Sequence, residues 1–287
     1  MAFWIKVLIF FLVLAVVSIA AFLVIGVKQN KSETKALVEK LFNASSIEKS
    51  HSVNFASLSE LPKPVEQYFR NVLFDGQKLI NLARFQQVGE LKVDPKSKNW
   101  SQFEASYFVS QSPVAFIWDA KIKIGPVIHV RVTDYFLDGI GAGNVSLMSA
   151  ITIGSDEDNP EINSGSLYRY LAESVWHPTA LLPQSGVKWE PVDENRAIAH
   201  LTKFGISISL EFRFNNLGEI TGIYTEDRFG KFGDKYVRYP WEGRFRNYEE
   251  FNGVKIPTEG EVGWHLTEGW WLFWKGKIVN AEFKYRS

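Results

Sequence analysis

One stretch of the sequence constrains the fold more than any other. Between Val7 and Val27 there is no charged residue, and only Ser18 and Gly26 interrupt the run of apolar side chains. An α-helix rises about 1.5 Å per residue, so this stretch forms a helix of about 31 Å, roughly the thickness of the hydrocarbon core of a bilayer. The sequence therefore predicts a single-pass membrane anchor over residues 1–27, which contacts the bilayer through residues 7–27.

A cleaved signal peptide is the alternative to an uncleaved anchor. The apolar region of a signal peptide usually has about 7–15 residues and ends at a small-x-small site. Ser18–Ala20 resembles such a site, but the apolar run continues beyond it to Val27. The longer run favours an anchor that is not cleaved.

The charges on either side of the run bear on its orientation. Lys6 precedes it, whereas Lys28, Lys31 and Lys35 follow it. By the positive-inside rule this distribution favours a cytoplasmic C-terminal part, although long C-terminal domains are translocated largely regardless of charge. Because an aromatic-rich β domain suits an extracytoplasmic site, we expect the C-terminal domain to lie outside the cytoplasm.

Composition divides the rest of the chain into a polar linker and one folded domain. Residues 28–60 are rich in Lys, Ser, Asn and Glu and predict a stalk, whereas residues 61–287 predict a single β-rich domain. Apolar residues spaced by three and four predict a helix near residues 64–74. A second helix is predicted near residues 165–177, and Pro178 ends it.

Alternation with a period of two residues predicts β-strands through most of this domain. It is clearest from Ile206 to Phe214, where five apolar residues alternate with four polar ones. The other predicted strands cover residues 103–109, 116–124, 127–136, 145–153, 220–225, 236–245, 254–264 and 270–285. Short turns such as Asn252-Gly253 join them, which is typical of antiparallel sheets.

These elements predict an α+β fold that is rich in β-structure. It consists of an N-terminal transmembrane helix and a large curved antiparallel sheet, similar to half of a barrel, that packs on one or two helices. We expect about ten to twelve strands. An open sheet of that width curls, and helices in its concave face leave an apolar cavity between the layers.

The second predicted helix carries a polar stripe on an otherwise apolar surface. Arg169, Glu173 and His177 follow one another at intervals of four residues, so they share one side of the helix. A helix that is apolar nearly all round is buried, and its polar stripe must find partners. The predicted partners in this polar network are Asp119, Arg131, Asp134, Glu242 and Arg244.

Two interpretations of the stripe remain open. Glu173 and His177, together with an aspartate such as Asp119, are candidate catalytic residues for acid–base chemistry. The same residues also suit an internal ion network that orients the helix, and structural ion pairs often form such clusters. The second interpretation is favoured.

Tryptophan is the other unusual feature of the domain. The chain has 10 tryptophans, and all except Trp4 lie in the predicted β domain. Core packing accounts for most of them, and an apolar pocket, or an aromatic edge at Trp270–Trp274 that touches the bilayer, would account for the excess. The residues predicted to line an apolar cavity are Trp118, Tyr170, Trp176, Trp241 and Trp264.

Charge and composition exclude several classes of function. The chain has 32 Lys and Arg against 32 Asp and Glu, so no overall positive field attracts nucleic acid. It has no cysteine, which excludes disulfides, thiolate nucleophiles and Cys-ligated metals. Its histidines show no metal-binding spacing, and it has no nucleotide-binding or hydrolase motif. The sequence thus predicts no metal, no cofactor and no nucleic-acid partner.

Several motifs resemble those of one bacterial family of unknown function, whose members are often attached to membranes. They lie in Leu61–Arg70, Trp118–Ala120, Tyr170–Pro183 (with YLAE-x-VW-x-PTALLP), Ser209–Phe214 and Pro240–Arg244 (PWEGR). The resemblance covers about residues 61–285 and implies no activity. In architecture, the chain is also similar to lipoprotein-carrier and lipid-binding half-barrel domains, which implies a curved sheet cupping helices over an apolar cavity.

Three functions follow as hypotheses. The first is a membrane-anchored binding domain, without enzymatic activity, for a lipid or other apolar small molecule. The second is a hydrolase or isomerase that uses Glu173, His177 and an aspartate. The third is a structural or interaction module of the cell envelope, which would have a filled core and a large exposed apolar patch.

Overall fold

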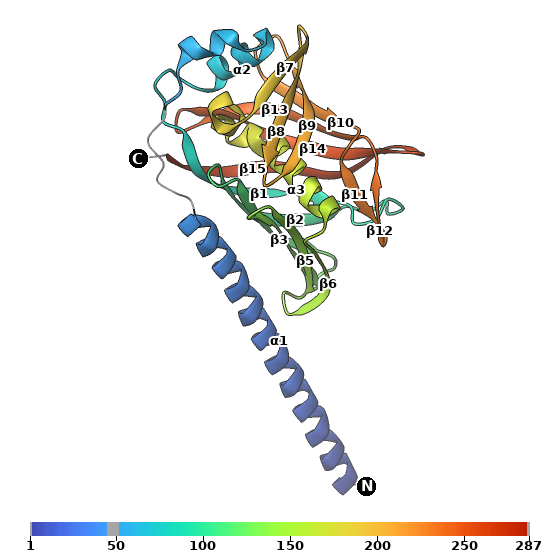
Figure 1. Ribbon diagram of the computed structural model, residues 1–287. Helices are drawn as coiled ribbons and strands as arrows, with labels where there is room; N and C mark the ends of the chain where they lie inside the picture. The colour runs from blue at the N-terminus through green and yellow to red at the C-terminus, as the bar shows by residue number, and fades with distance from the viewer. Residues whose placement is uncertain (1, 45–51, 286–287) are drawn as a thin grey trace.

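The computed structural model describes residues 2–44 and 52–285, and Figure 1 shows an open sheet with helices on both of its faces. The helices are α1 (Ala2–Ala44), α2 (Lys63–Val72) and α3 (Pro160–Glu173), with short 3-10 helices at Phe55–Glu60, Ser174–Trp176, Pro178–Leu181 and Pro183–Ser185. The strands of the first half are β1 (Ile80–Leu91), β2 (Ser101–Ser110), β3 (Ala115–Lys123), β4 (His129–Leu137), β5 (Ile140–Leu147) and β6 (Ile151–Glu157). Those of the second half are β7 (Lys188–Asp193), β8 (Arg196–Lys203), β9 (Ile206–Phe214), β10 (Ile220–Thr225), β11 (Phe229–Phe232), β12 (Lys235–Arg238), β13 (Trp241–Phe251), β14 (Val254–Leu266) and β15 (Gly269–Tyr285).

Thirteen of these strands form one antiparallel sheet. Their order is β6-β5-β4-β3-β2-β1-β15-β14-β13-β10-β9-β8-β7, and β11 pairs with β12 in a separate hairpin. The two outermost strands of the sheet, β6 and β7, come from the middle of the sequence. The first and last strands along the chain, β1 and β15, pair with each other at the centre of the sheet. The predicted fold class, a β-rich α+β fold with a large antiparallel sheet that does not close, is confirmed.

Alternation decides which face of each strand is buried. In β9, Ile208, Leu210 and Phe212 are buried in the concave face, while Ser207 and Ser209 point outward. The sequence predicted one strand over residues 145–153, and this prediction is wrong. The structure has a turn there, in which Met148 and Ser149 take the left-handed conformation (φ 52° and 56°), so β5 and β6 are separate strands.

Helix α3 lies in the concave face and belongs to the connection between the two outermost strands, β6 and β7 (Figure 1). The Asn159 side chain accepts a hydrogen bond from the Ile162 N–H, and Pro160 starts the helix. The α-helix ends at Glu173, where the sequence pattern predicted a helix over residues 165–177, and 3-10 turns follow.

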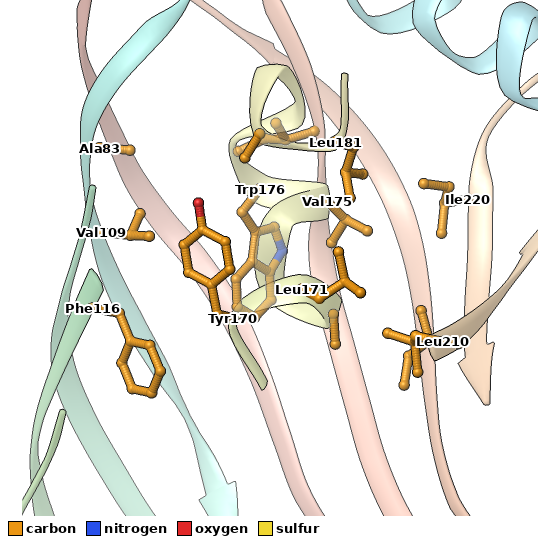
Figure 2. Packing of buried hydrophobic residues seen from close by; sticks show 14 of the residues in the cluster. Ala83, Val109, Phe116, Tyr170, Leu171, Val175, Trp176, Leu181, Leu210 and Ile220 are labelled. Atoms are coloured by element: carbon orange, nitrogen blue, oxygen red, sulfur yellow. The ribbon is translucent and has the colours of Figure 1, made fainter. Parts of the chain in front are cut away.

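Side chains fill the space around α3 on both sides (Figure 2). Tyr170 faces Val109 and Phe116 of the first half of the sheet, whereas Leu171 and Val175 face Leu210 and Ile220 of the second half. Helix α2, where the sequence predicted a helix near residues 64–74, packs beside them against β8 and β14. The core thus lies inside the curl of the sheet.

Helix α1 continues without interruption from the apolar run into the first part of the predicted polar linker. Its C-terminal half packs on the outer face of the sheet, where Leu41 is buried against Ile117 and Leu137. Closer to the N-terminus, the Asn30 amide donates a hydrogen bond to the Ser146 hydroxyl (3.2 Å). Residues 45–51, also within the predicted linker, lie outside the described residues.

The N-terminal half of α1 extends away from the domain (Figure 1), and its most apolar part has no residue buried against other parts of the chain. By length and composition this helix can cross a membrane. Transmembrane helices and signal sequences share these two properties.

The packing of α1 on the sheet predicts different effects for two leucines of the same helix. Replacing the buried Leu41 (Leu41→Ala) leaves a cavity beneath the helix, so we expect the free energy of unfolding to fall by about 2–3 kcal/mol. Leu12→Ala, at an exposed position of the apolar run, serves as the control. Thermal unfolding of the full chain in detergent compares them, and equal effects would contradict the observed packing.

Candidate functional site

A cavity of about 390 Å³ lies between α3 and the sheet. Three of the five residues predicted to line a cavity do so: Trp118, Trp176 and Trp241. Tyr170 is buried in the core instead, and Trp264 lines a neighbouring cavity. The wall is mostly apolar and also includes Leu91, Lys92, Val93, Ile122, Val132, Ala172, Ile223, Gly243, Phe245, Val262, Phe273 and Trp274.

Trp176 is at the centre of the aromatic wall. Its ring centroid lies 6.2 Å from those of Tyr107 and Phe245 and 6.4 Å from those of Phe85 and Trp274, mostly in edge-on or tilted arrangements. These partners come from β1, β2, β13 and β15, so both halves of the sheet contact the indole. The turn that follows α3 thereby places one rigid ring in the deepest part of the sheet.

Arg169 forms the charged end of the cavity. Its guanidinium donates to Asp134 on β4 (2.9 Å) and to Glu173 one turn further along α3 (2.8 Å), and it lies 5.1 Å from the ring centroids of Phe116 and Trp118. Burial raises the pKa of the Asp134 carboxyl, while the positive charge of Arg169 opposes that shift. The predicted stripe of α3 therefore finds its partner in Asp134.

Arg228 is a second cation at this end, and the sequence did not single it out. It lies 4.4 Å from the ring centroid of Trp241 and 5.0 Å from that of Trp264, and it donates to the Gly165 carbonyl (3.3 Å). Within residues 2–44 and 52–285 it forms no ion pair. Burial and the charge of Arg169 lower its pKa to about 9. Its position after Glu226-Asp227, in a charged connection between strands, gives no signal of burial.

A second cavity, of about 420 Å³, adjoins the first. Asp134, Arg169 and Arg228 line both cavities, so these three charged side chains form the partition between them. On the far side the lining is more polar and includes Asp156, which pairs with Lys231 of the β11–β12 hairpin. Polarity thus increases from the tryptophan end of the first cavity to the second cavity.

His177 lies apart from both cavities, although the stripe of α3 predicted it beside Glu173. It follows the 3-10 turn after α3 and is fully buried, with its ring 5.5 Å from that of Tyr170 and its Nε2 3.4 Å from the Ser174 hydroxyl. Burial lowers its pKa to about 3. The ring is therefore neutral near pH 7 and part of the core.

The remaining polar residues predicted for the network lie on the outer face of the sheet. Asp119 binds Arg131 through two hydrogen bonds of 2.6 and 2.7 Å. Glu242 accepts from Arg244 (2.8 Å) and contacts His265 (2.8 Å). The structure therefore divides the predicted network into three groups, and of the predicted residues only those in the group of Arg169 line the cavity. Glu261, which pairs with Arg244 (3.7 Å), lines it as well.

Three buried polar atoms of the first cavity have no hydrogen-bond partner among the described residues. They are the second carboxylate oxygen of Glu173, Oε2, and the indole Nε1 atoms of Trp176 and Trp241. All three atoms are inaccessible to water in this conformation, so they lie behind the surface of the cavity and not on it. The Glu173 carboxylate lies beside the buried Tyr107 phenol, and burial and this negative charge together raise the pKa of Tyr107. Across the described parts of the chain, no group of three or more His, Asp or Glu side chains is arranged to hold a metal ion.

The sequence profile of a family of unknown function, DUF6920, matches residues 59–283. The chain belongs to this family. Membership in an uncharacterised family was predicted from the motifs, and it is confirmed. None of the curated proteins matches the sequence.

Two solved structures are similar to this member of DUF6920. A LolA superfamily protein from Nitrosomonas europaea is similar over 81% of this chain and 94% of its own, at 8% sequence identity and a TM-score of 0.33. A beta-barrel-like protein of another domain of unknown function, DUF1849, from Brucella abortus, is similar over 72% of this chain and 98% of its own, at 10% identity and a TM-score of 0.23.

The ion pairs of Arg169 predict a large loss of stability when the arginine is removed. Arg169→Met leaves two carboxylates in a poorly hydrated site, so we expect the free energy of unfolding to fall by about 3 kcal/mol. Arg196→Met breaks an exposed pair with Asp193 and is expected to cost less than about 1 kcal/mol. Urea unfolding measures both, and a small effect of Arg169→Met would contradict a structural role for this cluster.

The burial of His177 predicts that acid destabilises the fold. The unfolded chain takes up a proton near the ordinary histidine pKa of about 6.5, whereas the folded chain does so only near pH 3, at the lowered pKa of His177. Between these values the unfolded state binds more protons. The contribution of this residue to stability is thus present above pH 6.5 and falls by about 1.4 kcal/mol per pH unit below it.

Urea unfolding between pH 7.5 and 5 measures this slope. The variant His177→Asn cannot bind the proton, so the pH dependence of its unfolding free energy should be shallower than that of the unchanged chain. Parallel pH curves for the two proteins would show that His177 takes up its proton as readily in the folded state as in the unfolded one.

Proposed function

We propose that this protein is a membrane-anchored domain that binds a lipid or another apolar small molecule inside the curled sheet, without catalysing a reaction. The cavity beside Trp176 is the observation on which the proposal depends. Its volume of about 390 Å³ is within the range of small-molecule sites, and its wall is mostly aromatic and aliphatic. A domain that served only as a structural module would be expected to fill this space with side chains.

The charged end of the cavity refines the class of ligand. Arg228 lines the cavity and forms no ion pair within the described residues, so an entirely apolar molecule beside it would leave its buried positive charge unpaired. A ligand with an apolar chain and a polar end satisfies both parts of the wall. The ligand we propose is therefore amphipathic, with its polar end towards Glu173 and Arg228.

The long apolar helix α1 supports the membrane anchoring that the proposal includes. An uncleaved α1 would hold the cavity close to a bilayer, which is the main source of amphipathic molecules in a cell. We place the domain on the extracytoplasmic side of that membrane.

The enzymatic alternative has less support. It requires Glu173, His177 and Asp119 to converge on one substrate. Glu173 lines the cavity, His177 lies in the core, and Asp119 is paired with Arg131 on the opposite face of the sheet. No observation favours a reaction over binding.

Photo-crosslinking tests the proposal in the full chain. A diazirine-bearing stearic acid and a diazirine-bearing phosphatidylcholine are added to membranes that contain the protein, and labelled peptides are mapped by mass spectrometry. We expect one or both probes to label peptides from α3 and from β13 to β15 as well as from α1. Labelling confined to α1 would disprove binding in the cavity.

A matched pair of variants separates cavity binding from surface labelling. Val262→Trp places a large ring in the cavity and should reduce labelling of the sheet several-fold, because a side chain of that size removes much of the free volume. Val192→Trp adds the same ring at an exposed position on β7 and should leave labelling unchanged.

A further inference from the structure

Two neighbouring turns, at the same end of the strands of the sheet, expose aliphatic side chains. Ile124, Val127 and Ile128 belong to the turn between β3 and β4, and Ile151 and Ile153 belong to β6, directly after the turn between β5 and β6. Val127 is 80% exposed and Ile153 is 57% exposed. These five residues are called the apolar rim below.

Hydrogen bonds join the two turns into one surface. The Met148 N–H donates to the His129 carbonyl (2.9 Å), and the His129 ring lies 3.0 Å from the Ser149 hydroxyl. The sheet holds the strands that lead into both turns, because β4 pairs with both β3 and β5. The rim is therefore a fixed part of the fold.

Helix α1 leaves the domain at this rim. Gly26 lies so close to the turn between β5 and β6 that a Cβ atom there would be 2.5 Å from the Ala150 carbonyl oxygen. Beyond Gly26, towards the N-terminus, the helix makes no buried contact with the domain. The point at which the apolar run meets the domain is thus beside the exposed aliphatic residues.

The length of the helix fixes the distance between the rim and the bilayer. Residues 7–25 make a helix of about 29 Å, close to the thickness of the hydrocarbon core, and the next charged residue along the chain is Lys28. A bilayer centred on this run therefore ends within about one helical turn of Gly26. Little helix remains to separate the domain from the lipid headgroups.

The charges near the rim are compatible with the same partner. Lys121 and Lys123 are exposed on β3, where Lys123 pairs with Glu104 of β2 (3.7 Å), whereas the acidic residues Asp156–Asp158 lie at the opposite end of β6. Lysines beside exposed aliphatic residues suit a bilayer surface, where headgroups carry negative charge and acyl chains begin a few ångströms deeper.

We propose that the apolar rim inserts into the interfacial layer of the bilayer that α1 crosses, so that this end of the sheet lies on the membrane surface. The proposal rests on the membrane anchor proposed above. It also gives the position of the cavity relative to the membrane. Strands β1, β3 and β5 all finish at this end of the sheet, and Leu91–Val93, at the end of β1, line the cavity. The cavity mouth is then on the membrane side of the domain, where an amphipathic molecule can enter it from the bilayer.

Single cysteines test the proposal, because the chain has none of its own. The full chain is reconstituted in phosphatidylcholine vesicles with a minor fraction of phosphatidylserine, and each cysteine carries an environment-sensitive fluorophore. Val127→Cys labels the rim. Leu217→Cys is the control, because Leu217 is 72% exposed and lies in the turn between β9 and β10, at the opposite end of the strands. Lipids with a nitroxide high on the acyl chain act as quenchers.

We expect the label at Val127 to shift to the blue and to be quenched by the nitroxide lipids, and the label at Leu217 to show neither effect. Both positions are exposed, so neither substitution disturbs the core. A Val127 label that behaves as the Leu217 label does would overturn the proposal. A blue shift without quenching would also overturn it, since it would mean that another protein or a second copy of the chain covers the rim.

A third position separates this inference from the anchor on which it rests. Val13→Cys lies in the middle of the apolar run and reports whether α1 crosses the bilayer. Quenching at Val13 by nitroxides placed deep in the acyl chains, without quenching at Val127, would disprove the rim alone. Absence of quenching at Val13 would disprove the anchor and the rim together.

Discussion

The two outermost strands of the sheet are consecutive in the sequence, and this constraint shapes the domain. After β6 the chain must reach β7 at the far edge, and it does so through the concave face as α3. A charged residue on such a helix is removed from water, so Arg169 needs its pairs with Asp134 and Glu173. Those ion pairs fix the rotation of α3, and the turn that follows then directs Trp176 into the deepest part of the sheet.

The cavity follows from the same arrangement. The charged partition of Asp134, Arg169 and Arg228 stands between α3 and the strands, so aliphatic side chains cannot fill that space. Bulky rings in edge-on contact, next to a partition that must remain polar, leave free volume that a core of aliphatic residues would occupy.

Much of this fold could be predicted because alternation reports directly on a sheet with one buried face. The predicted strand at Ile206–Phe214 matches β9 residue for residue. The division at residues 148–150 was missed because Met148 and Ser149 form the turn without glycine, asparagine or proline. The sequence also grouped Arg169, Glu173 and His177 by assuming a regular helix through residue 177, whereas the 3-10 turn after Glu173 sends His177 into the core.

The full extent of the α1 packing could not be predicted from hydrophobicity, because only its C-terminal part, around Leu41, is apolar. Between the apolar run and that part, the residues that face the sheet are Gly26, Asn30 and Thr34, which are small or polar and typical of a soluble linker. On β3, Ile117 packs against α1 while its neighbour Trp118 lines the cavity, so one strand contacts α1 with one face and the cavity with the other. The apolar helix therefore forms an outer layer of the domain, and the direction in which the cavity opens is fixed relative to it.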